Sequence, residues 1–539
     1  MLGNMMDTQL LIIDLLRHAR NRHPSQEVVS RRLEGDLHRS DYAQIWQRSS
    51  QLAHALDALG VQPGDCIATL AWNTHRHMEL YYAVSGIGAV LHTVNPRLFS
   101  EQIEYIINHA EDKLVFVDLS FVELLEPLQD RLKSVKGFVV MTDREHMPDS
   151  TLAPLHCFEE LLAAQVSEYE WPRFDENNAA ALCYTSGTTG NPKGVLYSHR
   201  AMVLHAQATA SRELLDLNPD TVLMPMVAMY HAGAWGAPYA APLAGCKLVL
   251  PGAGMDGASM SELIGSEGVT VGLGVPTIWL TLHNYWDDHA ISNTTLKRVC
   301  VGGAASPLGM VKLYQERYNI YWQPIWGMTE TGPLATSLPP APDIMALPAE
   351  ARYQLQTSAG RAAFGVELAL FDADDQRVSH DGDATGELRV RGPWISSQYY
   401  KNDDLSAFPD GWLATGDIAV IDPSGMLRVV DRKKDVIKSG GEWISSLEIE
   451  NIVSQHPSVN ECSVIGARHA KWDERPVLII VPNKNASITH QDMVNFLEGK
   501  IARWWTPDQT VFVSALPKTG TGKVLKNALR EQYGNVLLS

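Results

Sequence analysis

The sequence is poor in cysteine. Its 539 residues include six cysteines, and no two of them have the CxxC spacing. Disulfide frameworks and thiolate metal sites both need grouped cysteines, so the sequence argues against either kind of site. A few scattered thiols suit a reducing compartment, and the expected location is cytoplasmic.

Long apolar runs are also missing. A membrane-spanning helix needs about 18 to 20 consecutive apolar residues, and no segment of the chain reaches that length. The apolar stretch Leu10–Leu16 is interrupted by Asp14, follows no basic residue and precedes no small-residue cleavage site. We therefore expect neither a membrane span nor a secretory signal, and we interpret the chain as a soluble intracellular protein.

Basic residues are fewer than acidic residues. Lys and Arg number 44 against 62 Asp and Glu, which gives a net charge of −18. Because this excess of negative charge repels nucleic acid, we expect no nucleic-acid partner. The segment Val436–Ser539 is an exception, since it carries 11 basic against 10 acidic residues. A near-neutral tail beside an acidic body predicts two units with different surfaces.

Apolar residues are plentiful, at 45% of the chain against 20% charged residues, which is enough to form large buried cores. Expected helices and apolar strands alternate over Asp41–Leu59, Cys66–Leu70, Met78–Gly88, Lys113–Val117 and Phe138–Met141. Continuous apolar strands separated by helices are typical of parallel sheets that are covered on both faces. The predicted fold class is therefore α/β, with a large N-terminal domain of parallel α/β subdomains.

From about Gly365 the pattern changes to short strands separated by turn signals. The expected strands are Val366–Phe371, Gly386–Arg391, Trp412–Ala414, Ile418–Ile421 and Leu427–Val430. Short strands at close, regular spacing predict a small antiparallel, β-barrel-like part of the N-terminal domain.

Beyond Arg432 the pattern is α+β. Helices are expected at Ser446–Gln455 and Thr489–Trp504, and strands at Glu461–Ile465 and Val477–Val481. We therefore predict an N-terminal domain over residues 1–431 and a small, mobile α+β C-terminal domain over residues 432–539.

The strongest local signal for chemistry is the segment from Tyr184 to Val195, which follows an apolar strand. It holds five hydroxyl groups, three glycines and Lys193 within twelve residues. Glycines let backbone N–H groups approach an anion, hydroxyls donate to phosphate oxygens and a lysine supplies charge, so the segment predicts a phosphate cradle. A flexible surface loop of small residues is the alternative interpretation. Because Gly190 is not followed by Lys and Ser or Thr, this is not a Walker A loop.

Four further segments follow in order, at Trp326–Glu330, Thr415–Asp417, Asp431–Glu442 and Pro517–Lys523. Together with Tyr184–Val195, they resemble the signatures of the adenylate-forming superfamily of acyl-CoA synthetases, luciferases and peptide-synthetase adenylation domains. The resemblance covers nearly the whole chain. It implies an acid–CoA ligase that converts ATP, a carboxylic acid and CoA into acyl-CoA, AMP and pyrophosphate through an acyl adenylate.

The resemblance assigns most of the site residues to ATP. Those implied in ATP or AMP binding are Thr185, Ser186, Gly187, Thr188, Thr189, Gly190, Lys193, Gly302, Gly303, Ala304, Trp326, Gly327, Met328, Thr329, Asp417 and Arg432. Glu330 and Thr185 are implied to hold Mg²⁺, which prefers oxygen ligands. Asp417 is implied to accept both ribose hydroxyls. By themselves, these residues also fit a buried structural glutamate and a turn aspartate.

Four residues are implied in catalysis, namely Lys523, Glu330, Lys193 and Lys438. On its Gly/Thr loop, Lys523 would place a charge on the ester between the carboxylate and the α-phosphate, and a solvated loop lysine is the alternative. The C-terminal domain is expected to turn about a hinge near Lys434 after the first step, which withdraws Lys523 and brings Lys438 to the thiol. The implied CoA and hinge residues are Lys434, Asp435, Lys438, Gly440, Gly441, Glu442, Trp443 and Glu474.

The acid pocket is implied by the segment Pro225–Gly236 and by the small residues that follow an apolar strand at Val299–Val301. The implied substrate-binding residues are His231, Trp235, Gly302, Trp326 and Pro333. Two indoles near the acyl channel would shorten it and favour a slim apolar chain. His231 also fits an ordinary core histidine.

Within the superfamily, His231–Gly236 and Gly441–Ser445 resemble the bacterial 3-methylmercaptopropionate–CoA ligases of dimethylsulfoniopropionate breakdown. Medium-chain fatty acid ligases share these motifs, so the predicted substrate is 3-methylmercaptopropionate or another short- to medium-chain acid. The alternatives are a medium-chain fatty acid or aromatic acid ligase, and transfer of the adenylate to an acyl carrier protein. A nucleotide sensor without turnover and a luciferase-type oxygenase are more distant alternatives. The expected partners are the acid, ATP and CoA, and a homodimer is allowed.

Overall fold

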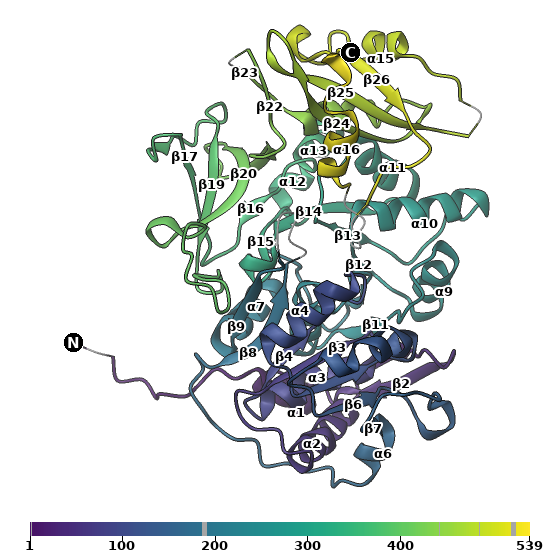
Figure 1. Ribbon diagram of the computed structural model, residues 1–539, viewed down its shortest axis with the longest axis vertical. Helices are drawn as coiled ribbons and strands as arrows, with labels where there is room; N and C mark the ends of the chain where they lie inside the picture. The colour runs from purple at the N-terminus through teal and green to yellow at the C-terminus, as the bar shows by residue number, and fades with distance from the viewer. Residues whose placement is uncertain (2, 186–190, 441, 485, 519–523, 539) are drawn as a thin grey trace.

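The computed structural model describes residues 1, 3–185, 191–440, 442–484, 486–518 and 524–538. Four sheets organise the chain, and Figure 1 shows their arrangement. Two large sheets form the N-terminal part at the bottom and centre of the view. A smaller antiparallel sheet lies to one side, and the C-terminal sheet lies at the top. This arrangement confirms the predicted α/β class, with a large N-terminal and a small C-terminal domain.

The first large sheet has seven strands in the order β7-β6-β5-β3-β4-β8-β9, and all its pairs are parallel except β8 with β9. Its strands are β3 (Cys66–Leu70), β4 (Val90–Thr93), β5 (Leu114–Val117), β6 (Gly137–Val140), β7 (Leu155–Cys157), β8 (Ala179–Tyr184) and β9 (Gly194–Ser198). The helices connecting them are α3 (His75–Gly86), α4 (Ser100–Ala110), α5 (Val122–Leu125) and α6 (Phe158–Ala163).

The second large sheet has nine strands in the order β16-β15-β14-β13-β12-β10-β11-β1-β2, with a parallel centre and antiparallel edges. Its strands are β1 (Glu27–Arg31), β2 (Leu37–Asp41), β10 (Val222–Pro225), β11 (Lys247–Leu250), β12 (Val271–Gly274), β13 (Arg298–Val301), β14 (Tyr321–Gly327), β15 (Leu334–Ser337) and β16 (Arg361–Ala362). The helices along this part are α1 (Ile12–Arg22), α2 (Tyr42–Ala58), α7 (His199–Ala210), α8 (Ala237–Ala244), α9 (Gly257–Glu267), α10 (Pro276–Asp288), α11 (Leu308–Tyr318), α12 (Pro342–Met345) and α13 (Ala349–Leu355).

The largest core lies around a helix layer next to both large sheets. Helices α1, α2, α3, α7 and α8 contact one another in this layer. The same apolar cluster contains Ile67 and Leu91 from the seven-stranded sheet and Leu248 and Leu273 from the nine-stranded sheet. Burying the apolar faces of both sheets against one helix layer drives their association. Among the described residues, no helix combines the length and the apolar character that crossing a membrane requires.

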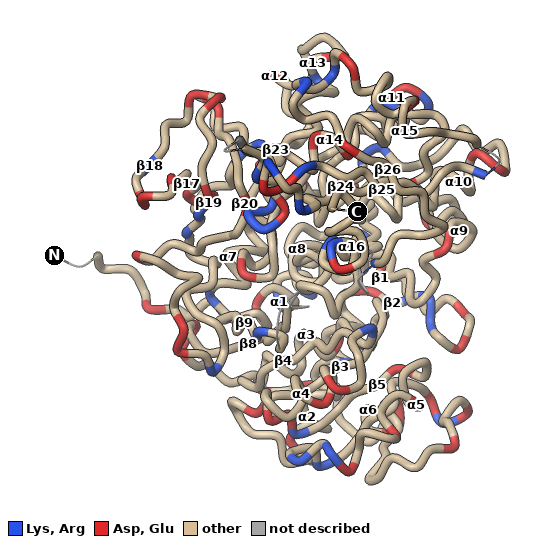
Figure 2. Tube along the Cα trace, turned by 45° about the horizontal axis from the view of Figure 1, so that its top comes forward, with Lys and Arg blue, Asp and Glu red and all other residues tan. Residues whose placement is uncertain are grey.

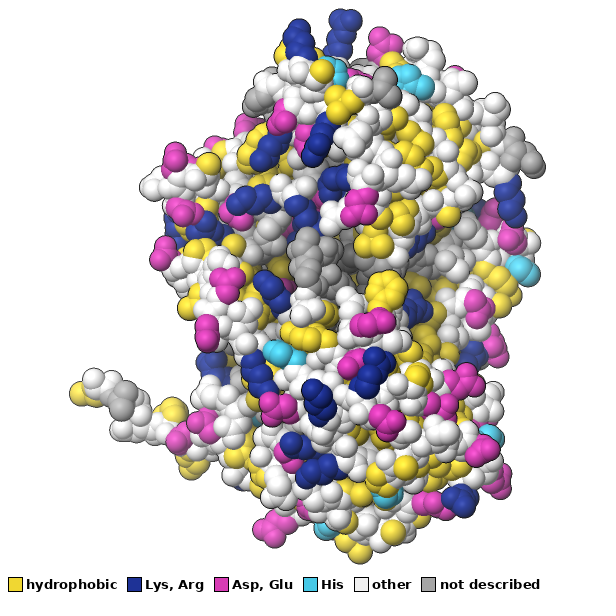
Figure 3. Space-filling model, in the orientation of Figure 1, with side chains coloured by type: hydrophobic (Ala, Val, Ile, Leu, Met, Phe, Trp, Pro, Cys, Tyr) yellow, Lys and Arg dark blue, Asp and Glu magenta, His cyan; other side chains and the backbone are white. Residues whose placement is uncertain are grey.

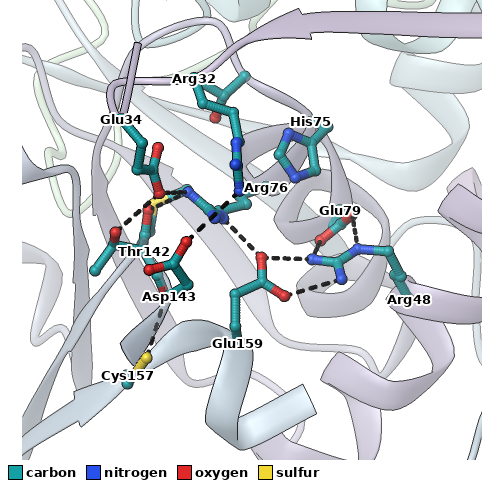
Figure 4. Close-up of polar contacts among 12 residues, drawn as sticks. Arg32, Glu34, Arg48, His75, Arg76, Glu79, Thr142, Asp143, Cys157 and Glu159 are labelled. Atoms are coloured by element: carbon teal, nitrogen blue, oxygen red, sulfur yellow. Dashed lines mark hydrogen bonds and ion pairs between the residues drawn. The ribbon is translucent and has the colours of Figure 1, made fainter. Parts of the chain in front are cut away.

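A buried group of ion pairs joins the helices at the edge of this layer (Figure 4). Arg48 on α2 binds Glu79 on α3 at 2.6 Å and Glu159 on α6 at 3.0 Å. Arg76 on α3 binds the same Glu159 at 2.8 Å and Glu34, which follows β1, at 2.6 Å. Burial favours a higher pKa for Glu159, but Arg48 and Arg76 outweigh it and lower the pKa below its usual value. These shared arginines fasten α2, α3 and α6 to one another.

The third sheet is antiparallel and has the order β18-β17-β19-β20-β21. Its strands are β17 (Glu367–Phe371), β18 (Arg377–Val378), β19 (Gly386–Arg391), β20 (Leu413–Ile421) and β21 (Leu427–Arg432). The sequence predicts two strands at Trp412–Ala414 and Ile418–Ile421, and the structure corrects this to one strand, β20. The register of β20 shifts against both of its neighbours, which lets the strand continue through Gly416, where φ is +72°.

The fourth sheet belongs to the C-terminal domain, with the order β23-β22-β25-β24 and with β26 paired to β25. Its strands are β22 (Ile437–Ser439), β23 (Glu442–Ile444), β24 (Val459–His469), β25 (Asp473–Pro482) and β26 (Gln509–Phe512), and its helices are α14 (Ser446–Val453), α15 (His490–Leu497) and α16 (Lys526–Tyr533). The helix predicted over Thr489–Trp504 is wrong in its second half. Helix α15 ends at Leu497, and Gly499 follows in the left-handed region at φ +73°.

Candidate active site

The segment Tyr184–Val195 connects β8 to β9, as the sequence predicts for a cradle that follows a strand. The N–H of Thr185 donates to the carbonyl of Lys193 at 2.9 Å, which closes the base of the connection. Thr185 is half-buried, whereas Lys193 is exposed. The predicted phosphate ligands Ser186, Gly187, Thr188, Thr189 and Gly190 lie outside the described residues. Their roles therefore stay predictions.

Tyr399, which lies in none of the sequence motifs, contacts both Glu330 and Lys193. Glu330 is 5% exposed and accepts a hydrogen bond of 2.7 Å from the hydroxyl of Tyr399. The ammonium of Lys193 lies 4.8 Å from the centroid of the Tyr399 ring, a favourable cation–π arrangement. Burial and the nearby Glu330 carboxylate raise the pKa of Tyr399, so its hydroxyl keeps its proton and remains a donor. Tyr399 thus connects two of the four residues predicted to be catalytic.

The backbone around Glu330 is held by further contacts. Glu330 lies in a short 3₁₀ turn, Thr329–Thr331, and the hydroxyl of Tyr197 on β9 donates to the carbonyl of Thr329 at 2.6 Å. Gly327 packs so closely on Pro333 that a Cβ at this position would lie 1.8 Å from the Pro333 carbonyl oxygen. Only glycine fits there, because any side chain would overlap the backbone.

Asp417 lies on the other side of the Trp326–Glu330 segment, on β20. It is 2% exposed, and one of its carboxylate oxygens accepts a 3.0 Å hydrogen bond from the indole N–H of Trp326. The other oxygen lies 2.9 Å from Nε of Arg432, the residue paired with Asp417 across β20 and β21. Two donors therefore fix the orientation of the carboxylate that is predicted to bind ribose.

Trp326 packs between two apolar cores. Its ring packs against both the large core and the apolar core of the antiparallel sheet. With its N–H on Asp417, the indole contacts the predicted ribose carboxylate, and its assignment to ATP stays a prediction. Its assignment to the acyl channel stays a prediction.

Trp235 and Gly302 contact each other. A Cβ built on Gly302, which directly follows β13, would lie 3.5 Å from the ring of Trp235 and 2.9 Å from the carbonyl oxygen of Ile325. Any larger residue at position 302 would therefore collide with β14. Gly303 and Ala304, which come next, are exposed, while Met328 and Thr329 are half-buried. Two small exposed residues, Gly303 and Ala304, therefore follow the glycine that lies against the Trp235 indole.

The segment after His231 has an unusual backbone. Residues Ala232, Gly233, Ala234, Trp235 and Gly236 all have positive φ, between +44° and +81°. Each non-glycine residue in this left-handed region costs on the order of 1 kcal/mol. Strain of this kind persists where packing enforces it and is common at functional sites. His231, which precedes the turn, is half-buried, and its role stays a prediction.

An apolar cavity borders this turn. Its lining includes Tyr81, Cys183, Tyr197, Met202, Gly233 and Tyr239, which come from β8, β9 and helices of the central layer as well as from the turn. The cavity has a volume of about 20 Å³, which is room for roughly one water molecule and too little for an acyl chain.

The predicted CoA and hinge residues lie on the C-terminal domain. Lys438 on β22 is exposed, and its backbone N–H donates to the carboxylate of Glu474 at 3.0 Å, so these two predicted residues are neighbours. Gly440 has φ +60° and packs against Trp472, and the side chain of Trp443 is 51% exposed. The side chain of Lys434 reaches the surface, but it is partly desolvated. This desolvation, together with the positive charges of Arg432 and Arg530, lowers the pKa of Lys434 despite the opposing charge of Asp435. Gly441, the side chain of Glu442, and Lys523 lie outside what the structure describes.

Figure 3 shows the surface hollowed across the middle of the view, between the C-terminal sheet above and the N-terminal sheets below. Glu330 has a hydroxyl donor, Tyr399, whose ring also contacts the Lys193 ammonium, and Asp417 is held by an indole and a guanidinium. Such a set can bind a triphosphate and a vicinal diol.

Comparison with known proteins identifies the family of the chain. The family model of AMP-binding enzymes matches residues 16–400, and the model of their C-terminal domain matches residues 448–523. A medium-chain-fatty-acid–CoA ligase of Ectopseudomonas oleovorans is 46% identical over 538 residues, which cover 100% of this chain and 98% of the relative. A 3-methylmercaptopropionyl-CoA ligase of Ruegeria lacuscaerulensis is 45% identical over 537 residues and 100% of both chains.

Solved structures agree on the fold. An anthranilate CoA ligase in complex with anthranoyl-AMP superposes with a TM-score of 0.87, at 24% sequence identity and over 98% of both chains.

Proposed function

Because the chain belongs to the family of AMP-binding enzymes and is an ATP-dependent acid–CoA ligase, we propose that it activates a short- to medium-chain carboxylic acid, with 3-methylmercaptopropionate as the leading candidate. The observation that carries this proposal is the pair of fixed carboxylates, Glu330 on Tyr399 and Asp417 on Trp326 and Arg432. One carboxylate would face the phosphates and the other the ribose of ATP.

The proposed reaction has two steps. An oxygen of the substrate carboxylate attacks the α-phosphorus of ATP, the bond to the β-phosphate breaks, and acyl adenylate and pyrophosphate form. The CoA thiol then loses its proton and attacks the acyl carbon, and AMP leaves with the bonding electrons. In the first step, Lys193 would screen the pyrophosphate, and Lys523 would stabilise the charge that develops at the α-phosphate. Lys438 would serve the second step.

The donors near Glu330 fit Mg²⁺. Glu330 is a hard oxygen ligand that Tyr399 holds in place, and Thr185 is a hydroxyl on the adjoining connection. We propose that these two residues hold the metal. Bound there, Mg²⁺ would neutralise phosphate charge.

The proposed acid follows from the pocket and from the relatives. Trp235 lies against Gly302, so a bulky indole occupies the space next to the residue that would line the pocket. A filled channel favours short chains, such as that of 3-methylmercaptopropionate. The medium-chain relative of similar identity makes a medium-chain fatty acid the second candidate.

The test is pyrophosphate and AMP release with a panel of acids. The panel contains straight-chain acids from propionate to dodecanoate, 3-methylmercaptopropionate and benzoate, each assayed with and without CoA. We expect the highest kcat/KM for 3-methylmercaptopropionate or a neighbouring short acid, with AMP release dependent on CoA. A profile that peaks at the longest acids or at benzoate would contradict the proposed acid. AMP release that needs a carrier-protein arm in place of CoA would contradict the proposed acceptor.

Three further features belong to the same proposal. The hinge is near Lys434, with the C-terminal domain over residues 432–539 turning between the two steps. The location is the cytoplasm. A homodimer is allowed, and sedimentation of the purified protein would test it directly.

A further inference from the structure

A chain of hydrogen bonds and ion pairs connects the start of α16 to the last strand of the antiparallel sheet. Lys526, the first residue of α16, lies 2.8 Å from a carboxylate oxygen of Glu450 and 2.6 Å from the hydroxyl of Ser446, both on α14. Ser446 in turn donates from its hydroxyl and its backbone N–H to one carboxylate oxygen of Asp431, at 2.6 and 2.7 Å. Asp431 lies on β21.

This connection is shielded from water. The side chains of Lys526 and Glu450 are 15% and 16% exposed, and Asp431 is 4% exposed. Burial favours a lower pKa for Lys526, but the carboxylates of Glu450 and Asp431 outweigh it and raise the pKa, so the ammonium stays charged. Hydrogen bonds to buried charges are stronger and more directional than those on a surface. Figure 2 shows acidic and basic residues close together around α14, β20 and α16.

The connection crosses the proposed hinge. Asp431 precedes Lys434 and is paired in register with Ile418 of β20, one position from the pairing of Arg432 with Asp417. Ser446, Glu450 and Lys526 all follow Lys434. A second link across the same boundary is the hydroxyl of Ser445, which donates to the carbonyl of Val430 at 2.6 Å.

The other end of the connection is the base of the loop that contains Lys523. The described residues on either side of that loop are tied together, because Leu525 donates its N–H to the carbonyl of Pro517 at 2.8 Å and Lys518 pairs with Val524. Lys518 also binds Glu461 on β24 at 2.7 Å. Whatever fixes the start of α16 therefore fixes this base as well.

We propose that Lys526 and Ser446 are positioning residues for acyl-adenylate formation: Lys526 holds α16 against α14, Ser446 holds α14 against β21, and together they keep the C-terminal domain in the orientation for the first step. The proposal rests on the proposed function, because it assigns the first step to a lysine, Lys523, three positions before Lys526. In this arrangement, β21 places Arg432 against Asp417 and Asp431 against Ser446. The base of the lysine loop is thus linked through α16 and α14 to β21, the strand that also carries Arg432, the partner of the ribose carboxylate. Removing the Lys526 contacts loosens this link and disturbs the orientation for the first step.

The test compares Lys526→Met, Lys526→Arg and Ser446→Ala in the full-length enzyme. The matched control is Lys247→Met, because Lys247 on β11 is 18% exposed and also binds two carboxylates, those of Glu27 and Glu267. Lys526→Met leaves the buried Glu450 without its ion-pair partner, and Lys247→Met leaves the buried Glu267 with Arg39 alone, so both variants should lose stability. Single-turnover release of pyrophosphate measures the first step, and thioester formation from supplied acyl adenylate measures the second.

We expect Lys526→Met to slow pyrophosphate release by about tenfold or more while changing thioester formation by less than about threefold. Ser446→Ala should change the two rates in the same directions by a smaller factor, and Lys526→Arg should restore most of the first-step rate. The control Lys247→Met should change both rates by similar factors. If Lys526→Met also lowers both rates together, its role is only structural and the proposal is wrong.

A distance measurement decides the question independently of turnover. Spin labels at Glu316→Cys on α11 and Gln491→Cys on α15 report the separation of the N- and C-terminal domains. We expect Lys526→Met, but not Lys247→Met, to broaden or shift the distance distribution. An unchanged distribution would overturn the proposal even if the enzyme is an acid–CoA ligase. If no acid of the panel yields an adenylate, the proposed function fails, and a changed distribution would still support the connection as the element that sets the domain orientation.

Discussion

At the scale of single residues, the two carboxylates of the site are each oriented by a side chain that donates one hydrogen bond. Tyr399 orients Glu330, and Trp326 orients Asp417. The resemblance to adenylate-forming enzymes predicted the two carboxylates and Trp326. Tyr399 was missed because it lies 69 positions from Glu330 in the sequence and belongs to no recognised motif. Only the folded chain brings its hydroxyl to the carboxylate.

The Trp326 contact predicts an effect on ATP binding. Trp326→Phe keeps an aromatic ring but removes the N–H that faces Asp417, a residue that is 2% exposed. Because a hydrogen bond to a charged group contributes about 1.5–3 kcal/mol, we expect the KM for ATP to rise by roughly tenfold or more with a smaller change in kcat. Trp412→Phe, directly before β20, is the control, since its ring packs on Phe371. An equal KM for ATP in Trp326→Phe and the wild type would exclude the ribose role of this indole.

Trp235 predicts the limit on chain length. Trp235→Ala leaves a non-glycine residue at φ +57°, so the backbone strain stays while the indole beside Gly302 is removed. Each methylene buried in the new space contributes about 0.8 kcal/mol, which raises kcat/KM roughly three- to fourfold per added carbon. A chain-length series should therefore shift toward longer acids, while short acids react more slowly. If the profile stays the same, Trp235 is a core residue and the pocket is limited elsewhere.

At the scale of elements, Asp118, the residue directly after β5, is a buried acid that makes the free energy of unfolding depend on pH. Asp118 is 1% exposed and accepts the N–H of Trp72 at 2.7 Å, and burial raises its pKa to about 7. In the unfolded chain the pKa is near its ordinary value. Between about pH 4 and pH 7 the native state therefore holds a proton that the unfolded state has lost, and stability falls as the pH rises through this window.

Asp118→Asn removes this titration and keeps an acceptor for Trp72. We expect the difference in unfolding free energy between variant and wild type to move in favour of the variant from pH 5 to pH 8, by on the order of 2 kcal/mol. Denaturant unfolding at both pH values measures it. Asp149→Asn, at an exposed position, should show no such trend. A difference that does not vary with pH would show that Asp118 titrates normally.

The hinge belongs to the same scale. Lys434→Pro fixes φ near −65° at the proposed pivot, so the C-terminal domain should keep one orientation. We expect adenylation to stay within about threefold of the wild-type rate and thioester formation to fall by about tenfold or more. Lys434→Ala is the control, because it removes the charge and leaves the backbone free to rotate. Equal loss of both steps in the proline variant would indicate misfolding and would argue against a pivot at this residue.

The bounds of some helices and strands were predicted from the sequence, and those of others were not. Strands such as Cys66–Leu70 and Gly386–Arg391 were predicted at their true bounds, because an unbroken apolar run or a turn signal marks their ends. The end of α15 was missed because Ile501 and Trp504 continue an apolar pattern beyond Gly499, although they pack on the same core from outside the helix. The sequence pattern predicts burial, and the backbone conformation of Gly499 decides where the helix ends.

At the scale of the whole molecule, the fold class and the two-domain division follow from alternation of strands and helices and from the neutral charge of the last segment. The left-handed turn at Ala232–Gly236 and the connection from Lys526 to Asp431 were not predicted. Both arise from packing between segments far apart in the sequence. We propose an enzyme of two parts, in which the large domain would bind ATP and acid and the small domain would supply a different lysine to each step.

A single-turnover experiment on the wild type and on Lys523→Ala tests this account most directly. With enzyme in excess over labelled ATP, a substrate acid and no CoA, the wild type should release one equivalent of pyrophosphate and retain acyl adenylate, and AMP should leave only after CoA is added. Lys523→Ala should bind ATP and convert supplied acyl adenylate to thioester, but release pyrophosphate at least about a hundredfold more slowly. A pyrophosphate burst of normal rate in Lys523→Ala, or AMP release by the wild type without CoA, would contradict the account.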